Sequence, residues 1–127
     1  QMTPVGTWHT IDDKTGEAKA EIQIVEKDGV LSGRVVKSLR QDPQAKKTCE
    51  DCKDDRKDQA IIGMEIIRGV KHEPLAEFLW AGGGKILDPE NGKEYTVKMV
   101  PKEGGKKLQV RGYIGPFYRT QNWLRQP

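Results

Sequence analysis

Two cysteines separated by two residues are the side chains most able to do chemistry in this sequence. Cys49 and Cys52 are its only cysteines. As a disulfide they would close a very short loop, which stabilises a fold by about 2 kcal/mol in the chain-entropy model. As a redox pair they would need a thiolate of lowered pKa, and Glu50 and Asp51, which lie between them, oppose that charge. The spacing therefore favours a disulfide in an oxidising compartment, with a thiol-redox protein as the weaker alternative.

Two histidines complete the short set of metal ligands and catalytic bases. A structural zinc ion normally takes four ligands, and His9 and His72 lie far from each other and from the cysteines in the sequence. His9 follows Trp8 on the opposite face of an expected strand, and no serine or cysteine nucleophile in a turn accompanies it. The sequence therefore predicts no metal, no cofactor and no enzymatic activity.

Two segments with polar or glycine-rich character are interpreted as turns. Asp88, Glu90 and Asn91 would offer oxygen atoms to calcium, but the segment lacks the length and the terminal glutamate of an EF-hand. Its Asn-Gly step is instead a strong hairpin signal. The glycines at 82–84 lack the lysine and the following helix of a phosphate-binding loop.

The composition indicates one globular domain over residues 1–127. Hydrophobic residues make up 35% and charged residues 32%, with a mean hydropathy of -0.75, so the core must be thin or shared with a cavity. No segment approaches the roughly 20 apolar residues of a transmembrane helix. The net charge of +3 comes from 22 basic and 19 acidic residues that are interspersed, a balance too weak to indicate nucleic-acid binding.

Alternating residues predict an all-β fold. Ile22 and Ile24 alternate with polar neighbours, and Tyr95, Val97 and Met99 do the same later in the chain, which is the period of a strand with one buried face. This reading gives about eight to nine strands at the spacing of β-sandwiches and barrels. The expected strands cover residues 5–11, a segment ending at 27, and 30–39, 61–70, 78–80, 86–88, 94–99, 108–114 and 119–125.

Two segments do not follow a clear alternation. Residues 40–60 have no period and are predicted to form one long loop that carries both cysteines. Residues 61–70 fit either a helix or a strand. We favour the strand, because β-branched residues are frequent there and Gly63 and Gly69 would each cost about 1 kcal/mol in a helix.

The two ends of the chain carry matching signals. Gly6-Thr7-Trp8 places a large indole at the opening of the first strand, and Trp123-Leu124-Arg125 ends the last one. The indole must be covered, and in a short β chain the natural cover is the strand that closes the sheet. The pairing points to a closed barrel.

This arrangement resembles the calycin pattern of lipocalins, fatty-acid-binding proteins and avidins, in which the first tryptophan packs across the closed end of a barrel against a late basic residue. A wider set of motifs resembles an uncharacterised secreted bacterial family known as domain of unknown function 2147. These motifs are Gly6-Thr7-Trp8, Asp28-Gly29 to Gly33, Cys49-Glu50-Asp51-Cys52, Leu87-Asp88-Pro89-Glu90-Asn91-Gly92-Lys93 to Tyr95, Val110-Arg111-Gly112-Tyr113, and Arg119-Thr120-Gln121 to Trp123-Leu124-Arg125.

The resemblance implies a single antiparallel up-and-down barrel of the lipocalin type with one long cysteine-bearing loop. It also implies export to the periplasm or beyond through an N-terminal leader, and a leader removed before Gln1 would fit this chain. Gly6, Trp8 and Arg125 are then expected to close the barrel, with Arg111 as second choice for the cation.

An eight-stranded barrel is just wide enough to be filled by side chains or to hold one small ligand. Alternation alone does not decide which face of each strand points inward. Arg111 is either an anchor for a carboxylate or phosphate head group, or a structural residue that points outward or covers Trp8 through a cation-π contact. The candidate ligand-binding residues are Met64, Ile66, Trp80, Tyr95, Met99, Arg111, Tyr113 and Trp123.

Three functions remain after these exclusions. The first is a periplasmic or secreted binding protein for a small hydrophobic molecule, in one form an anionic one such as a fatty acid. The second is a ligand-free structural or protein-interaction module of the bacterial envelope. The third and weakest is a thiol-redox protein that uses Cys49 and Cys52. The sequence gives no indication of the oligomeric state.

Overall fold

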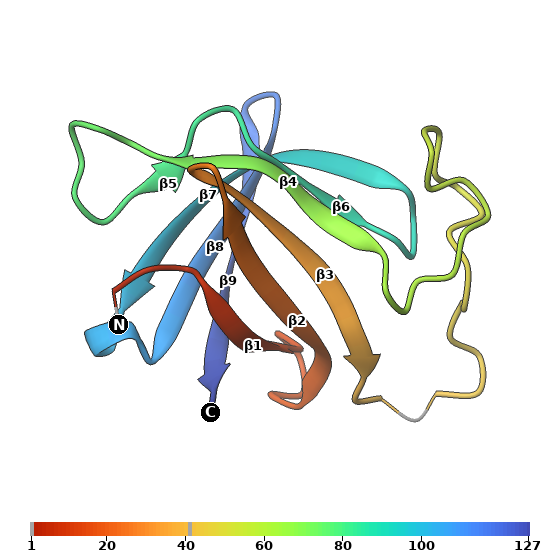
Figure 1. Cartoon of the computed structure of the whole chain (residues 1–127). Helices are drawn as coiled ribbons and strands as arrows, with labels where there is room; N and C mark the ends of the chain where they lie inside the picture. The colour runs from red at the N-terminus through yellow and green to blue at the C-terminus, as the bar shows by residue number, and fades with distance from the viewer. Residues whose placement is uncertain (1, 41) are drawn as a thin grey trace.

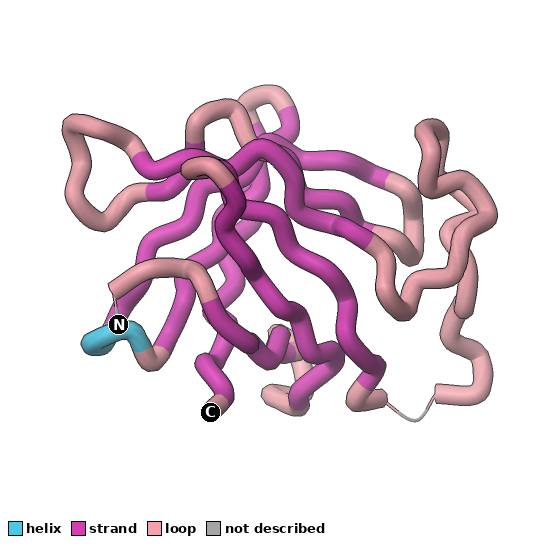
Figure 2. Tube along the Cα trace, in the orientation of Figure 1, coloured by secondary structure: helices cyan, strands magenta, loops and turns pink. Residues whose placement is uncertain are grey.

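The computed structural model describes residues 2–40 and 42–127 (Figure 1 and Figure 2). Gln1, on which the expectation of a removed leader rests, and Gln41, in the long loop, lie outside the described residues. Within them the chain forms nine strands and one short 3-10 helix. These are β1 (Gly6–Ile11), β2 (Ala18–Lys27), β3 (Val30–Ser38), β4 (Glu65–His72), β5 (Trp80–Ala81), β6 (Lys85–Asp88), β7 (Lys93–Lys102), η1 (Glu103–Gly105), β8 (Lys107–Ile114) and β9 (Phe117–Gln126).

The strands form one antiparallel sheet that closes on itself. Consecutive strands pair along the sheet, and β1 pairs with β9 to complete the circle. The short strands β5 and β6 share one position between β4 and β7, so the barrel has eight strands with one extra. The predicted all-β barrel with one long cysteine-bearing loop is confirmed.

Alternation of side chains builds the wall of the barrel. In β2, Ile22 and Ile24 are 1% exposed, whereas the side chains between and after them face solvent. In β7, Val97 and Met99 are fully buried and Lys98 is exposed. The period-two pattern in the sequence therefore corresponds to one face packed inside the barrel and one in water.

The segment predicted as a strand over residues 61–70 begins pairing only at Glu65. Residues Ile61 to Met64 form a turn, in which the amide of Met64 donates to the carbonyl oxygen of Ile61 at 3.0 Å. Gly63 has a φ of 88°, a conformation that interrupts a strand and suits glycine. The strand prediction is correct in type, but its start lies four residues later because this turn ends the long loop.

Trp8 lies at one end of the barrel, near the place where the described chain begins and ends (Figure 1). Trp8 is fully buried, and its indole nitrogen donates to the carbonyl oxygen of Pro4 at 2.8 Å. The guanidinium carbon of Arg125 lies 4.2 Å from the centre of the Trp8 ring, in cation-π geometry. The same guanidinium donates to three backbone carbonyl oxygens, those of Thr3, Val5 and Gly105, at 2.6, 2.7 and 2.6 Å.

Gly6 is required at this end by space and by backbone conformation. Its φ is 138°, and a Cβ atom there would lie 2.5 Å from a guanidinium nitrogen of Arg125. Burial lowers the pKa of the Arg125 guanidinium, which still remains protonated because arginine does not lose its proton in proteins. Gly6, Trp8 and Arg125 thus form one tightly packed unit that joins the first strand to the last.

Candidate functional site

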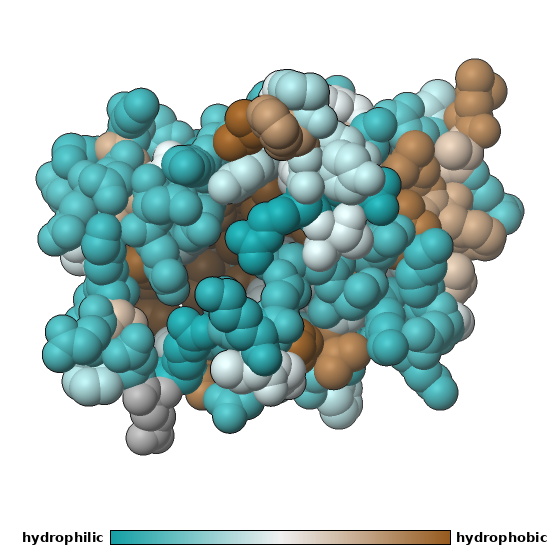
Figure 3. All heavy atoms as spheres, turned by 180° about the vertical axis from the view of Figure 1, so that it is seen from behind, coloured by the Kyte–Doolittle hydropathy of each residue, from teal (hydrophilic) through white to brown (hydrophobic). Residues whose placement is uncertain are grey.

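A cavity of about 250 Å³ occupies the half of the barrel remote from Trp8. Strands from all around the barrel contribute apolar side chains to its wall. From behind the molecule, hydrophobic atoms are visible inside a hollow framed by hydrophilic side chains (Figure 3). The apolar side chains that line the cavity include Ile22, Val35, Ile66, Ile86, Val110 and Trp123.

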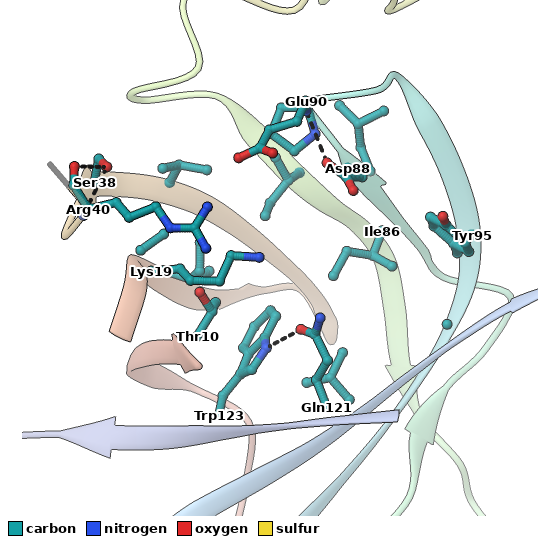
Figure 4. Close-up of a pocket in the computed structure, with 18 of the residues that line it drawn as sticks. Thr10, Lys19, Ser38, Arg40, Ile86, Asp88, Glu90, Tyr95, Gln121 and Trp123 are labelled. Atoms are coloured by element: carbon teal, nitrogen blue, oxygen red, sulfur yellow. Dashed lines mark hydrogen bonds between the residues drawn. The ribbon is translucent and has the colours of Figure 1, made fainter. Parts of the chain in front are cut away.

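Lys19 is the charged side chain with the clearest aim into this cavity. It extends from β2 with its ammonium group directed at the space between Ile86 and Trp123 (Figure 4). Its ammonium group makes no hydrogen bond or contact ion pair with any residue that the structure describes, although its charge interacts with that of the Asp12 carboxylate. A half-buried ammonium with no hydrogen-bond acceptor in contact leaves its donors available to an anionic ligand.

An irregularity in the sheet explains why Lys19 points inward. Thr10 pairs with Ala20 and Ile11 pairs with Ala18, so Lys19 is an extra residue on β2 opposite the step between them. A β-bulge of this kind leaves one residue unpaired and redirects its side chain. Regular alternation from Ile22 would have left Lys19 outside the barrel.

Gln121 adds a second polar group beside Lys19. It lies two residues before Trp123 on β9, and its side-chain oxygen accepts a hydrogen bond from the Trp123 indole at 3.1 Å. The amide nitrogen of Gln121 is therefore left to face the cavity (Figure 4). Thr10 and Tyr95 add hydroxyl groups to the lining, and neither hydroxyl is hydrogen-bonded to a described residue.

The other cations at the mouth are already paired with carboxylates. Arg40 binds Asp12, and Arg119 lies 3.0 Å from a carboxylate oxygen of Asp13. Lys46 is 3.2 Å from a carboxylate of the long loop. Lys19 is the lining cation that makes no contact ion pair among the described residues, although its charge interacts with that of Asp12.

Asp12 is held in its charged form by the turn between β1 and β2. The backbone N–H groups of Lys14 and Thr15 donate to its carboxylate at 2.7 and 3.2 Å. These two hydrogen bonds lower the pKa of Asp12, and the charges of Arg40 and Lys19 lower it further. Arg40 is thereby fixed at the rim beside an ionised carboxylate.

The opposite rim of the cavity is acidic. Asp88 uses its carboxylate to accept the amide hydrogen of Glu90 at 3.0 Å and the side-chain amide of Asn91 at 3.3 Å, which makes the tight turn between β6 and β7. Asp88 and Glu90 both line the mouth. The mouth thus has cations on β2, after β3 and on β9, and carboxylates at this turn, so a ligand anion would be held toward Lys19.

Three of the sequence-predicted residues line the cavity, namely Ile66, Tyr95 and Trp123. Three others, Met64, Trp80 and Met99, belong to the buried core but are not part of the lining. Met99 is fully buried and pairs with Val110, which marks where the packed half of the barrel ends. The predicted cluster is therefore divided between cavity and core.

Arg111 and Tyr113 lie on the outer face of the barrel. The Arg111 guanidinium donates to the hydroxyl of Thr120 at 2.8 Å and lies 4.7 Å from the centre of the Tyr118 ring. The inward residues of β8 are the alternate ones, Val110 and Gly112 among them. The phase of alternation in β8, which the sequence left open, thus directs Arg111 away from the cavity, and Arg125 supplies the cation over Trp8.

The cysteine loop packs against the outside of the barrel. Cys49 and Cys52 form a disulfide and are buried. Next to them Arg56, only 4% exposed, donates to the carboxylates of Asp54 and Glu94. The hydrogen bonds from Arg56 lower the pKa of Asp54 to about 2. An ionic cluster thus fastens the loop to β7, and within residues 2–40 and 42–127 no group of three His, Cys, Asp or Glu side chains is arranged to hold a metal ion.

Residues 6–125 match the model of a family described as an uncharacterized protein conserved in bacteria, DUF2147. The chain belongs to the DUF2147 family. No curated protein matches this DUF2147 sequence. Among solved structures it is similar to the protein HP1028 from the human pathogen Helicobacter pylori, which is described as belonging to the lipocalin family, with 16% identity and a TM-score of 0.78 over 97% of this chain and 82% of that one.

The structural likeness establishes a lipocalin-like fold for the DUF2147 chain. An identity of 16% supports the fold alone. The part of the chain that the structure describes contains no helix of the length and hydrophobicity needed to cross a membrane.

Proposed function

We propose that this DUF2147 protein binds a small amphipathic anion, with the apolar part inside the barrel and the carboxylate or a similar head group at Lys19 and Gln121. The observation that carries the proposal is the bulge that turns Lys19 into the cavity, where its ammonium group makes no contact ion pair with a described carboxylate. A lipocalin-like barrel is an architecture that encloses small ligands, which supports binding rather than catalysis.

The volume of the cavity limits the size of the ligand. An engineered apolar cavity of about 150 Å³ holds benzene, which has six carbon atoms. By the same ratio, the 250 Å³ cavity holds about ten heavy atoms. The ten carbon atoms of a medium-chain fatty acid such as decanoate fit this limit, with the two carboxylate oxygens at Lys19, whereas the chain of octadecanoate would extend into solvent.

The chemistry of the lining supports the orientation of such a ligand. Ile86 and Val110 offer aliphatic contacts, and the Trp123 ring closes one side of the cavity. The Lys19 ammonium and the Gln121 amide both donate hydrogen bonds, as a carboxylate requires. The acidic turn at Asp88 and Glu90 would repel the same head group from the opposite rim.

The disulfide supports a place of action outside the reducing cytoplasm. Disulfides persist in oxidising compartments such as the periplasm or the extracellular space. Cys49 and Cys52 are bonded to each other and buried under their loop. We therefore propose that the protein binds its ligand in the periplasm or outside the cell.

Titration of the purified protein with decanoate, followed by calorimetry, tests the proposal. Lys19→Gln should raise the Kd about tenfold to a hundredfold, because it removes a charge-assisted hydrogen bond, while the melting temperature stays unchanged. Lys27→Gln, an exposed lysine at the far turn, is the matched control and should bind as the wild type does. Arg111→Ala should also leave the affinity unchanged, since Arg111 faces outward.

Octadecanoate provides the size control in the same experiment. It should bind no more tightly than decanoate despite its longer chain, because the extra methylene groups remain outside the cavity. Absence of decanoate binding, or an affinity that Lys19→Gln leaves intact, would contradict the proposal.

A further inference from the structure

The outer face of β7, β8 and β9 carries aromatic rings and cations. Thr96, Tyr113 and Tyr118 lie opposite one another across the three strands, and the two tyrosine rings are 5.6 Å apart. Two registers further along, on the same face, Lys98 pairs with Arg111. The Lys98 ammonium lies 5.2 Å from the centre of the Tyr113 ring. Similarly, the Arg111 guanidinium lies 4.7 Å from the centre of the Tyr118 ring. We name these residues, together with Lys85, the basic aromatic face.

The cations of this face have no carboxylate partners among the described residues. Lys85 donates to the hydroxyl of Thr96 at 2.9 Å, and Arg111 donates to a threonine on β9. Neither they nor Lys98 is in an ion pair. Glu94, which lies two residues before Thr96 on β7, is bound by a buried arginine of the cysteine loop. The face therefore carries three cations whose charge is not neutralised by contact.

The tip of the hairpin between β8 and β9 carries exposed apolar side chains, which by alternation project on the side opposite the two tyrosines. Phe117 is 76% exposed and Ile114 is 44% exposed, although both are large and hydrophobic. They pair with each other at the last register before the turn, directly beyond the two tyrosines. Hydrophobic atoms stand out near the top of Figure 3, where Figure 1 has this hairpin.

We propose that the basic aromatic face and the hairpin tip dock the protein on the surface of an anionic lipid bilayer. Phe117 and Ile114 enter the boundary between head groups and acyl chains, the tyrosines lie at head-group level, and Lys85, Lys98 and Arg111 contact lipid phosphates. Aromatic and basic residues are the groups that suit this interface. Charge complementarity selects an anionic surface, and apolar side chains beyond the cations favour a bilayer over a nucleic acid or an acidic peptide.

Docking by this hairpin would bring the cavity close to the bilayer. Gly112 and Arg119 line the mouth of the cavity and pair with each other across β8 and β9, two registers below Ile114 and Phe117. A ligand that partitions into lipid would thus have a short path between membrane and barrel. The docking surface lies outside the cavity, so membrane binding can be tested independently of the proposed ligand.

Co-sedimentation with phospholipid vesicles tests the docking surface without any added ligand. The protein should sediment with vesicles made of equal parts phosphatidylcholine and phosphatidylglycerol, and much less with phosphatidylcholine alone. Rising salt should weaken the binding, because exposed charges are screened. The double variant Lys85→Gln/Lys98→Gln should lower the partition coefficient about 25-fold, at roughly fivefold for each cation near an anionic surface. Phe117→Ser should lower it about tenfold by removing the inserted ring.

Two control variants make the assignment specific. Leu75→Ser removes a hydrophobic side chain that is 99% exposed on the loop between β4 and β5, and Lys27→Gln removes a cation at the turn between β2 and β3. Both should sediment as the wild type does. The proposal is overturned if the protein stays in solution with the anionic vesicles, if both vesicle types bind it equally, or if the controls lose as much binding as the variants of the face. Binding to polyglutamate with no sedimentation would assign the face to an acidic protein and overturn it as well.

Discussion

The two halves of the barrel interior are built from the same strands, but one is filled by side chains and the other encloses a cavity. The half next to Trp8 is filled, with Met99 and Leu108 fully buried, whereas the other half encloses a cavity of about 250 Å³. Strand pairing is continuous through both halves. The difference therefore arises from the side chains rather than from the backbone.

Side-chain size decreases along individual strands from the filled half to the hollow half. A barrel of eight strands has room for side chains or for one small ligand, so a few small residues at inward positions are enough to create space. Three strands show this step between inward residues: Trp8 to Thr10 in β1, Ile24 to Ala20 in β2, and Leu108 to Gly112 in β8. The filled half gives stability and the hollow half gives room for binding.

Removing a large side chain from each half should give the largest difference between them. Trp8→Ala should lower the free energy of unfolding by about 3–5 kcal/mol, because it empties a packed site and leaves Arg125 without its aromatic contact. Ile86→Ala, which only widens an existing cavity, should lower it by about 1 kcal/mol. Urea denaturation measures both values, and equal losses would mean that the two halves are packed alike.

Adding atoms should also destabilise the filled half more than the hollow half. Gly33→Ala places a Cβ atom 2.8 Å from the Cδ1 atom of the fully buried Ile67, so it should destabilise the fold by about 1–3 kcal/mol. Ala20→Leu places its atoms in the cavity and should change stability by less than about 1 kcal/mol. It should nevertheless weaken decanoate binding at least about tenfold. Unchanged binding in Ala20→Leu would show that the ligand lies elsewhere.

Low pH should have the smallest effect on the free energy of unfolding. The effect arises in the cysteine loop, which packs outside the barrel. The pKa of Asp54 is about 2 in the folded protein, below its usual 3.8, so its contribution to stability is present above pH 4 and is lost as the pH falls from about 4 to 2. Because the Asp54 side chain is 43% exposed, solvent screening limits the effect to about 1 kcal/mol. Asp54→Asn should remove this acid-dependent part in denaturation curves recorded at several pH values.

Asp28→Asn, at an exposed turn, is the matched control and should retain the wild-type pH profile. An unchanged profile in Asp54→Asn would show that the ion cluster around Arg56 does not stabilise the fold. Hydrogen exchange at low pH measures whether the backbone amides of the cysteine loop lose protection before the amide of Trp8 does.

The architecture could be predicted from the sequence because the signals for it are local. Alternation in β2 and β7 and the turn at 91–92 each depend on a few neighbouring residues. The ends of the chain carried a further signal, since the paired tryptophan and arginine motifs fit a closed sheet. The start of β4 was less certain, because Gly63 forms a turn within a run of apolar residues.

The candidate site could be predicted only in part because it depends on the phase and irregularity of strands. Arg111 and Val110 are neighbours, and a shift of one residue decides which of them faces the interior. Lys19 was not singled out because a bulge turns it inward against regular alternation. Gln121 did have a signal, its spacing of two residues from Trp123, but nothing in the sequence separated it from an ordinary polar position.

The contact between Arg125 and the first residues of the chain also constrains how the protein is made. The Arg125 guanidinium and the carbonyl oxygen of Val5 are joined across 120 positions of sequence, and β1 has β9 as its neighbour in the sheet. Contacts of such long sequence separation form late in folding, because a large loop must close first. The indole of Trp8 therefore stays without its Arg125 cover until the ninth strand has joined the sheet.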